Sequence, residues 1–355
     1  MGANKNEIGW AGLDCRFSDY TKAKHFAGGV LFLIRRRSLI LVLLLLVVVT
    51  GCGLRTAQKA PRLQSDPKEP GPVAVARSGR EPNLTLFDNE SGQKKEIMLE
   101  DYITGVVAAE MDPAWPTEAL AAQAILARTF TLETLASKGG TRSLHGTDVS
   151  TKVEEFQAYD PSRINDNVRK AVQSTKGKVL FYRGDLVKAW FSAYAGTKTA
   201  LAKEGLNYKE TEPPYIKSVS NPGVKNAPPE DKIWTATFSR QELEAALNKM
   251  GLQPGTGNTV SISKRGPTGR AIEIDVFGTK VSGADLRVAL GSTRLKSILI
   301  DNIEVKDSTV TFTGRGYGHG VGMCQWGAYS LAKEGKKSDE IVAHFFEGVK
   351  IEKLY

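Results

Sequence analysis

One carboxylate, Glu110, lies within an apolar pattern that has the spacing of a helix. Ile103, Val106 and Val107 repeat at intervals of three and four residues, and Glu110 continues the same face. A carboxyl group against apolar surface loses hydration of its charged form, so we expect its pKa to rise. Because a protonated acid in a cleft can serve as a general acid, the pattern predicts a catalytic Glu110. A structural role, in a helix cap or an ion pair with a buried Arg, is the alternative.

The chain after Glu110 predicts a second helix that packs on the first. Pro113 ends the first helix, because the residue before a proline avoids the helical region. Pro116 then opens an alanine-rich helix that runs to Ser137. Its small side chains allow close packing, and we expect Arg128 on this second helix to point back toward Glu110.

The remaining sequence predicts shorter elements. Helices are expected at residues 168–174, 239–250 and 283–290, and strands at residues 84–87, 178–182, 187–194, 234–238, 260–263, 272–277 and 309–313. Helices come first and strands dominate later, which indicates the α+β class. We therefore expect an N-terminal helical pair, carrying the catalytic Glu, packed on a mixed and mostly antiparallel β-rich region.

Composition excludes several classes of protein. The chain has 355 residues, a formal net charge of +9 and an ordinary apolar content, so it is neither disordered nor fibrous. Its first 51 residues hold seven basic against three acidic side chains, and the surplus elsewhere is small. Such a surplus suits work beside an anionic wall or membrane and does not require nucleic acid. Three scattered cysteines are too few for a disulfide framework or a zinc finger.

The N-terminus has the pattern of an export signal. Three arginines at 35–37 precede an apolar run at 39–49 and then the small residues before Cys52. Eleven apolar residues are short for a bilayer span. The segment up to Cys52 is similar to a bacterial lipobox, in which the cysteine carries the lipid; an uncleaved signal anchor is the alternative. Both predict an extracytoplasmic protein anchored to the cell membrane.

Three segments follow from this pattern. Residues 1–52 are the signal peptide with lipobox, or the signal anchor. Residues 53–83 are rich in Pro, Gly, Lys, Arg and Ser without an apolar period, which predicts a flexible tether. Residues 84–355 form the folded domain.

A glycine-rich segment near the C-terminus is the second candidate site. Between Gly314 and Gly322 every second residue is glycine, which lets a backbone approach a ligand closely. His319 and Gln325 supply hydrogen-bonding groups there, while Tyr317 and Trp326 supply flat apolar faces. These groups suit sugar rings, which have apolar faces and polar edges. The segment lacks the pattern of a nucleotide-binding loop. A tight bulged loop without a ligand is the alternative.

Longer blocks of the sequence resemble the stage II sporulation protein D / LytB family. The resemblance lies in residues 102–111 with 115–130, in 191–199, in 282–291 and in 314–328 with the ending at 344–349, and it extends over about residues 84–352. It implies a peptidoglycan lytic transglycosylase, which cuts the β-1,4 bond between N-acetylmuramic acid and N-acetylglucosamine in denuded glycan strands and leaves a 1,6-anhydro ring. No cofactor is implied.

The resemblance also implies roles for individual residues. Glu110 aligns with the family's catalytic acid, and Arg128 with a basic residue needed for activity. Intramolecular attack by the sugar's own 6-hydroxyl removes the need for the second carboxylate of ordinary glycosidases. The full set of expected substrate-binding residues is Arg128, Gln123, Ser192, Gly196, Lys225, Tyr317, His319, Gln325 and Trp326.

One stretch departs from the family pattern. Some members bind zinc through one histidine and two cysteines after the second helix, and here His145 is followed by Ser150 and Phe156 at the cysteine positions. We therefore expect no metal. Expected partners are peptidoglycan strands, a cell-wall amidase and a membrane scaffold of the engulfment machinery. Sporulation and general wall remodelling both remain open, and a non-catalytic, wall-binding amidase enhancer is the competing function.

Overall fold

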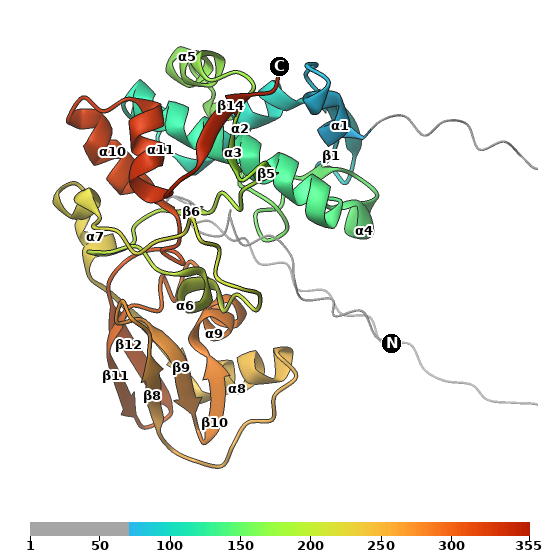
Figure 1. Ribbon diagram of the computed structural model, residues 1–355. Helices are drawn as coiled ribbons and strands as arrows, with labels where there is room; N and C mark the ends of the chain where they lie inside the picture. Colours follow the sequence, from blue (N-terminus) through green and yellow to red (C-terminus); the bar gives the residue numbers. More distant parts are fainter. Residues whose placement is uncertain (1–70) are drawn as a thin grey trace, which may run out of the picture. The chain divides into compact units, whose positions relative to one another are not determined.

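The computed structural model describes residues 71–355, and Figure 1 shows the arrangement of their helices and strands. The predicted export signal and Cys52 lie outside the described residues. Within residues 71–355, no helix combines the length and apolar character needed to cross a bilayer.

Two helices form the central pair that the sequence predicts. Helix α2 spans Leu99–Glu110 and α3 spans Thr117–Lys138. Most side chains of both helices are buried, including nearly every alanine of α3, because small residues let neighbouring segments approach from several sides. Gly139 ends α3 in the left-handed conformation, at φ 73°.

The folded region begins earlier than the sequence predicts. Helix α1 spans Pro72–Arg77, within the segment assigned to a flexible tether, and Ala76 is fully buried. The prediction of a tether up to residue 83 is therefore wrong for residues 72–77. This helix contacts α3, so a tertiary contact orders a segment whose own composition favours no structure.

The first hydrophobic core surrounds α2 and α3 and takes side chains from both ends of the described chain. The further elements that precede or follow the second core are β1 Asn83–Phe87, β2 Lys94–Met98, α4 Arg142–His145, β3 Val149–Ser150, η1 Pro161–Arg163, α5 Asp166–Ser174, β4 Lys178–Tyr182, β5 Asp185–Leu186, β6 Phe191–Ser192, α6 Ala202–Leu206, η2 Pro222–Lys225, α7 Pro229–Lys232, β13 Met323–Cys324, α10 Gln325–Lys333, α11 Ser338–Phe345 and β14 Lys350–Lys353.

A second hydrophobic core lies within residues 234–312, so the predicted domain of residues 84–355 contains two cores. Its elements are β7 Trp234–Ser239, α8 Arg240–Lys249, β8 Val260–Arg265, β9 Ala271–Val276, β10 Thr279–Ser282, α9 Gly283–Leu290, β11 Ile300–Lys306 and β12 Thr309–Gly314. The strands form two antiparallel sheets, in the orders β11-β12-β7 and β10-β9-β8. Ser239 caps α8 as the sequence predicts.

The α+β class is confirmed. Helices and sheets are mixed, and most strand pairs are antiparallel, with β1/β3 and β6/β13 parallel. The strand predicted at residues 187–194 is wrong for most of its length, because only Phe191–Ser192 pairs as a strand. Its apolar side chains are buried, and burial alone produces the same sequence pattern as pairing.

Candidate functional site

Glu110 is the last residue of α2, and its side chain faces the interior. Only 2% of the residue is exposed, as its place on the apolar face predicts. Its Oε1 atom accepts a hydrogen bond of 2.9 Å from the backbone N–H of Ala158, in a loop 48 residues further along the chain. An N–H donor favours the ionised carboxylate, whereas burial favours the neutral acid. The Glu110 carboxylate is thus held in the interior by a hydrogen bond from a loop remote in the sequence.

The loop that covers Glu110 is held by a close approach to α2. The Tyr159 ring stacks on the Tyr102 ring, with centroids 5.5 Å apart and an interplanar angle of 10°. A Cβ atom on Gly105 would lie 2.3 Å from Cε2 of Tyr159, so any other residue here would displace the Tyr159 ring. Burial raises the pKa of Tyr102 well above its usual range, and the nearby Glu110 charge raises it further. Gly105 and Tyr159 thus place Ala158 over the carboxylate.

An aromatic cluster lies just after Glu110 in the chain. Trp115 contacts Trp326 and Tyr329 of α10, with ring centroids 4.4 and 5.0 Å apart. Trp115 is buried, whereas Trp326 and Tyr329 are partly exposed. The glycine-rich C-terminal segment therefore meets the turn between α2 and α3, and it presents flat apolar faces of the kind that sugar rings stack on.

Several other predicted residues lie in the same part of the fold but are buried. Nε2 of Gln325 donates to Oε1 of Gln123 over 3.5 Å, which links α10 to α3. Ser192 pairs with Cys324 in the parallel strands β6 and β13. All four of these residues are at most 2% exposed. They pack the interior in this structure, and their direct contact with a glycan stays a prediction.

The glycine-rich segment is fixed against the turn that follows β6. Tyr194 and Tyr317 exchange two backbone hydrogen bonds of 2.8 and 2.7 Å. Gly196, two residues further on, has φ 73°, which favours glycine. Nδ1 of His319 accepts the Val321 N–H at 3.0 Å, and His319 is 2% exposed. The segment is a tightly packed loop, of the kind left open as an alternative.

Lys225 lies at the end of η2 and is exposed. Its neighbour Asn226 donates to the Ser330 hydroxyl at 2.7 Å, which places η2 beside α10. Among the predicted substrate-binding residues, Lys225 and Trp326 thus have side chains that reach solvent. They lie on η2 and α10, which are in contact.

Arg128 does not point toward Glu110, and that prediction is wrong. Its guanidinium is fully buried and binds both carboxylate oxygens of Glu100, at 2.9 and 2.6 Å. It also donates to the carbonyl oxygen of Lys178 at 2.9 Å. Glu100 lies ten residues before Glu110, about 15 Å along the helix axis. Arg128 therefore ties the start of α2 to α3 and β4, and its contact with a glycan stays a prediction.

The stretch expected to lack zinc is held by hydrogen bonds. Nε2 of His145 lies 2.7 Å from Oε2 of Glu155, and the Ser150 hydroxyl donates to the same oxygen at 2.9 Å. The His145 ring stacks on Phe87 at 3.8 Å, and Phe156 is fully buried. In residues 71–355, no group of three His, Cys, Asp or Glu side chains is placed to hold a metal ion.

Sequence reasoning missed four contributors to these sites. Glu100 accepts the hydrogen bonds of the Arg128 guanidinium, and the Ala158 N–H donates to the Glu110 carboxylate. Trp115 and Tyr329 complete the aromatic cluster. A signal existed for Glu100, because it is an acidic residue in the first turn of α2. None existed for Ala158, which acts through its backbone.

Comparisons with known proteins agree with the resemblance. A family model described as stage II sporulation protein matches residues 88–182, and a domain of unknown function matches residues 207–322. Stage II sporulation protein D of Bacillus amyloliquefaciens is 34% identical over 76% of this chain and 78% of its own length. An uncharacterized protein of Brachyspira hyodysenteriae is also 34% identical, over 72% of this chain and 67% of its own length.

A third relative carries a different name. The amidase enhancer of Bacillus subtilis is 29% identical over 69% of this chain. The match covers 39% of that relative's own length. The chain belongs to the stage II sporulation protein D family.

Proposed function

We propose that this protein is a peptidoglycan lytic transglycosylase with Glu110 as its catalytic acid and base. The observation that carries the proposal is the carboxylate itself, 2% exposed at the end of α2 and bound by the Ala158 N–H. The membership of the family supports a role in the cell wall. The substrate would be denuded glycan strands, cut between N-acetylmuramic acid and N-acetylglucosamine.

One carboxylate suffices for the proposed reaction. Glu110 donates its proton to the glycosidic oxygen as the bond to the sugar's C1 breaks. The ionised carboxylate then takes the proton of the 6-hydroxyl on the same sugar, whose oxygen attacks C1 and closes the 1,6-anhydro ring. The Ala158 N–H stabilises the ionised carboxylate between the two steps. No water is consumed, so the reaction is an intramolecular transfer rather than a hydrolysis.

Sugar binding is assigned to solvent-accessible groups of α10 and η2. Trp326 and Tyr329 offer partly exposed rings beside Trp115, which follows Glu110 by five residues. Lys225 would supply a charge-assisted hydrogen bond from η2.

The test compares the full chain with its Glu110→Gln variant on peptide-free glycan strands, with mass spectrometry of the products. The matched control is Glu154→Gln, since Glu154 is exposed in the segment leading to the same loop. We expect 1,6-anhydro ends from wild type and control, and a loss of about 10³-fold in Glu110→Gln, since an amide cannot transfer the proton. Equal product from all three would refute the role of Glu110.

The second candidate function is that of a wall-binding amidase enhancer, which the name of one relative favours. If wild type and Glu110→Gln both bind the strands, release no product and raise the rate of a cell-wall amidase equally, this second function holds. Glu110 would then be a structural carboxylate.

Localisation and partners belong to the same proposal. We place the protein outside the cytoplasm, anchored through a lipid on Cys52 or through an uncleaved N-terminal segment, and acting with an amidase and a membrane scaffold. Mass spectrometry of the N-terminal peptide distinguishes the two anchors, because only a lipoprotein starts at a modified Cys52. Loss of the protein from the membrane fraction in Cys52→Ala supports lipidation.

A further inference from the structure

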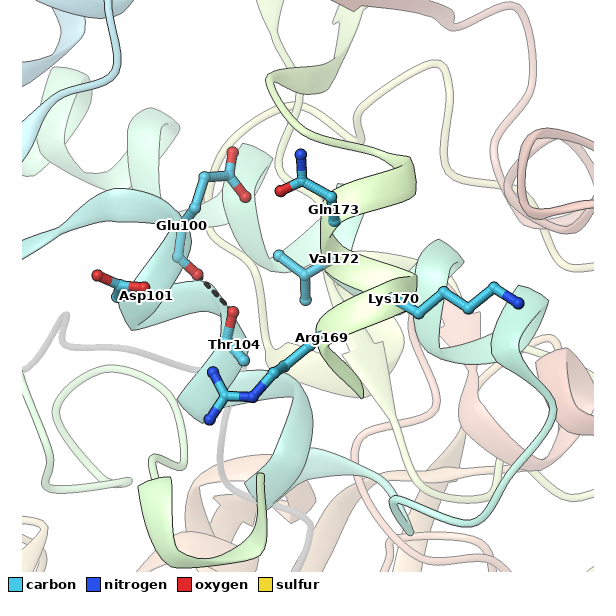
Figure 2. Close-up of a pocket in the computed structure, with 7 residues that line it drawn as sticks. All are labelled: Glu100, Asp101, Thr104, Arg169, Lys170, Val172 and Gln173. Carbon is cyan, nitrogen blue, oxygen red and sulfur yellow. Dashed lines mark hydrogen bonds between the residues drawn. The ribbon is translucent and has the colours of Figure 1, made fainter. Parts of the chain in front are cut away.

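A cavity of about 430 Å³ lies between α2 and α5 (Figure 2). Its lining consists of Glu100, Asp101, Thr104, Arg169, Lys170, Val172 and Gln173. Pockets of this size bind small ligands in other proteins, and nothing in the proposed reaction at Glu110 uses it.

Some charged groups around the cavity have hydrogen-bond partners within the described part of the chain, and others do not. The Glu100 carboxylate already accepts hydrogen bonds from Arg128, from the Gly177 N–H and from the Tyr355 hydroxyl. Within residues 71–355, the side chains of Asp101 and Arg169 make no hydrogen bond or ion pair, and neither does the amide of Gln173. The cavity therefore offers Asp101 and Arg169 on opposite helices, with the Gln173 amide beside them, and Lys170 as a second positive side chain in the lining.

Val172 and Thr104 are the buried members of the lining. Val172 is 3% exposed and lines the cavity from α5. The Thr104 hydroxyl donates to the Glu100 carbonyl oxygen at 2.7 Å, so its proton is not available to a ligand. Figure 2 shows Arg169 extending from α5 toward Thr104, whereas Lys170 extends away from the other labelled side chains.

This cavity is separate from the carboxylate that we assign to catalysis. Six residues separate Thr104 from Glu110, which is about 120° around the helix. Asp101 lies nine residues before Glu110, about 13 Å along the axis. The cavity therefore opens on another side of α2 and belongs to a second site.

We propose that the cavity binds an α-amino carboxylate, with Arg169 on the carboxylate and Asp101 on the ammonium group. The guanidinium fork matches a carboxylate through two parallel hydrogen bonds. The Asp101 carboxylate complements an ammonium group, and Gln173 can bond either end. The ligand is a free amino acid, or the exposed amino-acid end of a diamino acid within a wall peptide. This proposal does not depend on activity at Glu110.

Binding is tested on the full-length chain by saturation-transfer NMR with D-alanine, N-acetyl-D-alanine and D-alaninamide. Wild type should bind D-alanine about tenfold more tightly than either blocked probe, the effect of one charge-assisted hydrogen bond. Arg169→Gln should no longer discriminate D-alanine from D-alaninamide. Asp101→Asn should no longer discriminate it from N-acetyl-D-alanine. Lys170→Gln is the matched control and should keep both preferences.

A further arm identifies the source of the ligand. A wall disaccharide that carries a tripeptide ending in diaminopimelate presents the same amino-acid group on a covalent stem. Tighter binding of this fragment than of D-alanine identifies wall peptide as the source, and the reverse order identifies a free amino acid. Failure of wild type to bind any probe, or equal binding of all probes by all variants, overturns the proposal.

Discussion

Replacing Arg128 by methionine should destabilise the protein rather than remove a catalytic group. The substitution leaves the volume of the side chain nearly unchanged and deletes the guanidinium, which is fully buried. Glu100, whose side chain is 12% exposed, then loses its two hydrogen bonds from Arg128, at 2.6 and 2.9 Å. The remaining donors are the Gly177 N–H and the Tyr355 hydroxyl.

The magnitude follows from this geometry. Removing one partner of a buried ion pair costs about 3–5 kcal/mol, because the other charge stays in the interior. Since two neutral donors still reach Glu100, we expect the lower end, about 3 kcal/mol. Arg128→Lys keeps the charge but loses the fork, and should cost about 1–2 kcal/mol.

Unfolding in urea measures these changes in the free energy of unfolding. Urea is uncharged, so it does not screen the ion pair as guanidinium would. The control is Arg169→Met, the same change at an exposed arginine, which should stay within about 0.5 kcal/mol of wild type. In a double-mutant cycle, Arg128→Met and Glu100→Gln should be coupled by at least about 1 kcal/mol. An Arg128→Met protein with wild-type stability and no transglycosylase product would refute this reasoning and restore Arg128 to the active site.

Three further outcomes are expected. Gly105→Ala should lower the free energy of unfolding by about 1–3 kcal/mol, since its Cβ would meet Tyr159 at 2.3 Å; unchanged urea stability would contradict the packing. The backbone N–H of Ser239 holds the pKa of Glu242 at about 2, so the stability it contributes is present above pH 4.5 and lost as the pH falls toward 2. Melting curves of wild type and Glu242→Gln should therefore converge in acid. Burial raises the pKa of Cys324 to about 11, so iodoacetamide at pH 8 should label it only after unfolding, as peptide mapping would reveal.

The local sequence pattern was sufficient to predict several helices and the buried position of Glu110. Apolar spacing predicted α2, and the sequence predicted that Glu110 would share its buried face. Helix α3 begins directly after Pro116 and ends at Gly139, and Ser239 caps α8. Proline, glycine and serine can be used in this way because they act on backbone conformation within a few residues. These are short-range effects, which a sequence carries explicitly.

The partners of charged groups were decided only by the tertiary structure. Arg128 and Glu110 lie on adjacent helices, and the sequence offered no means to choose Glu100 over Glu110 as the partner of Arg128, since both are carboxylates on α2. The donor to Glu110 is the backbone of Ala158, 48 residues away, and a backbone N–H has no sequence signature.

Burial of the short helix α1 and the separation of the two cores also depend on contacts between distant segments. The sequence thus determined which residue types lie on which helix face. The fold determined which of them meet, because pairing distances depend on how remote segments pack rather than on spacing along the chain.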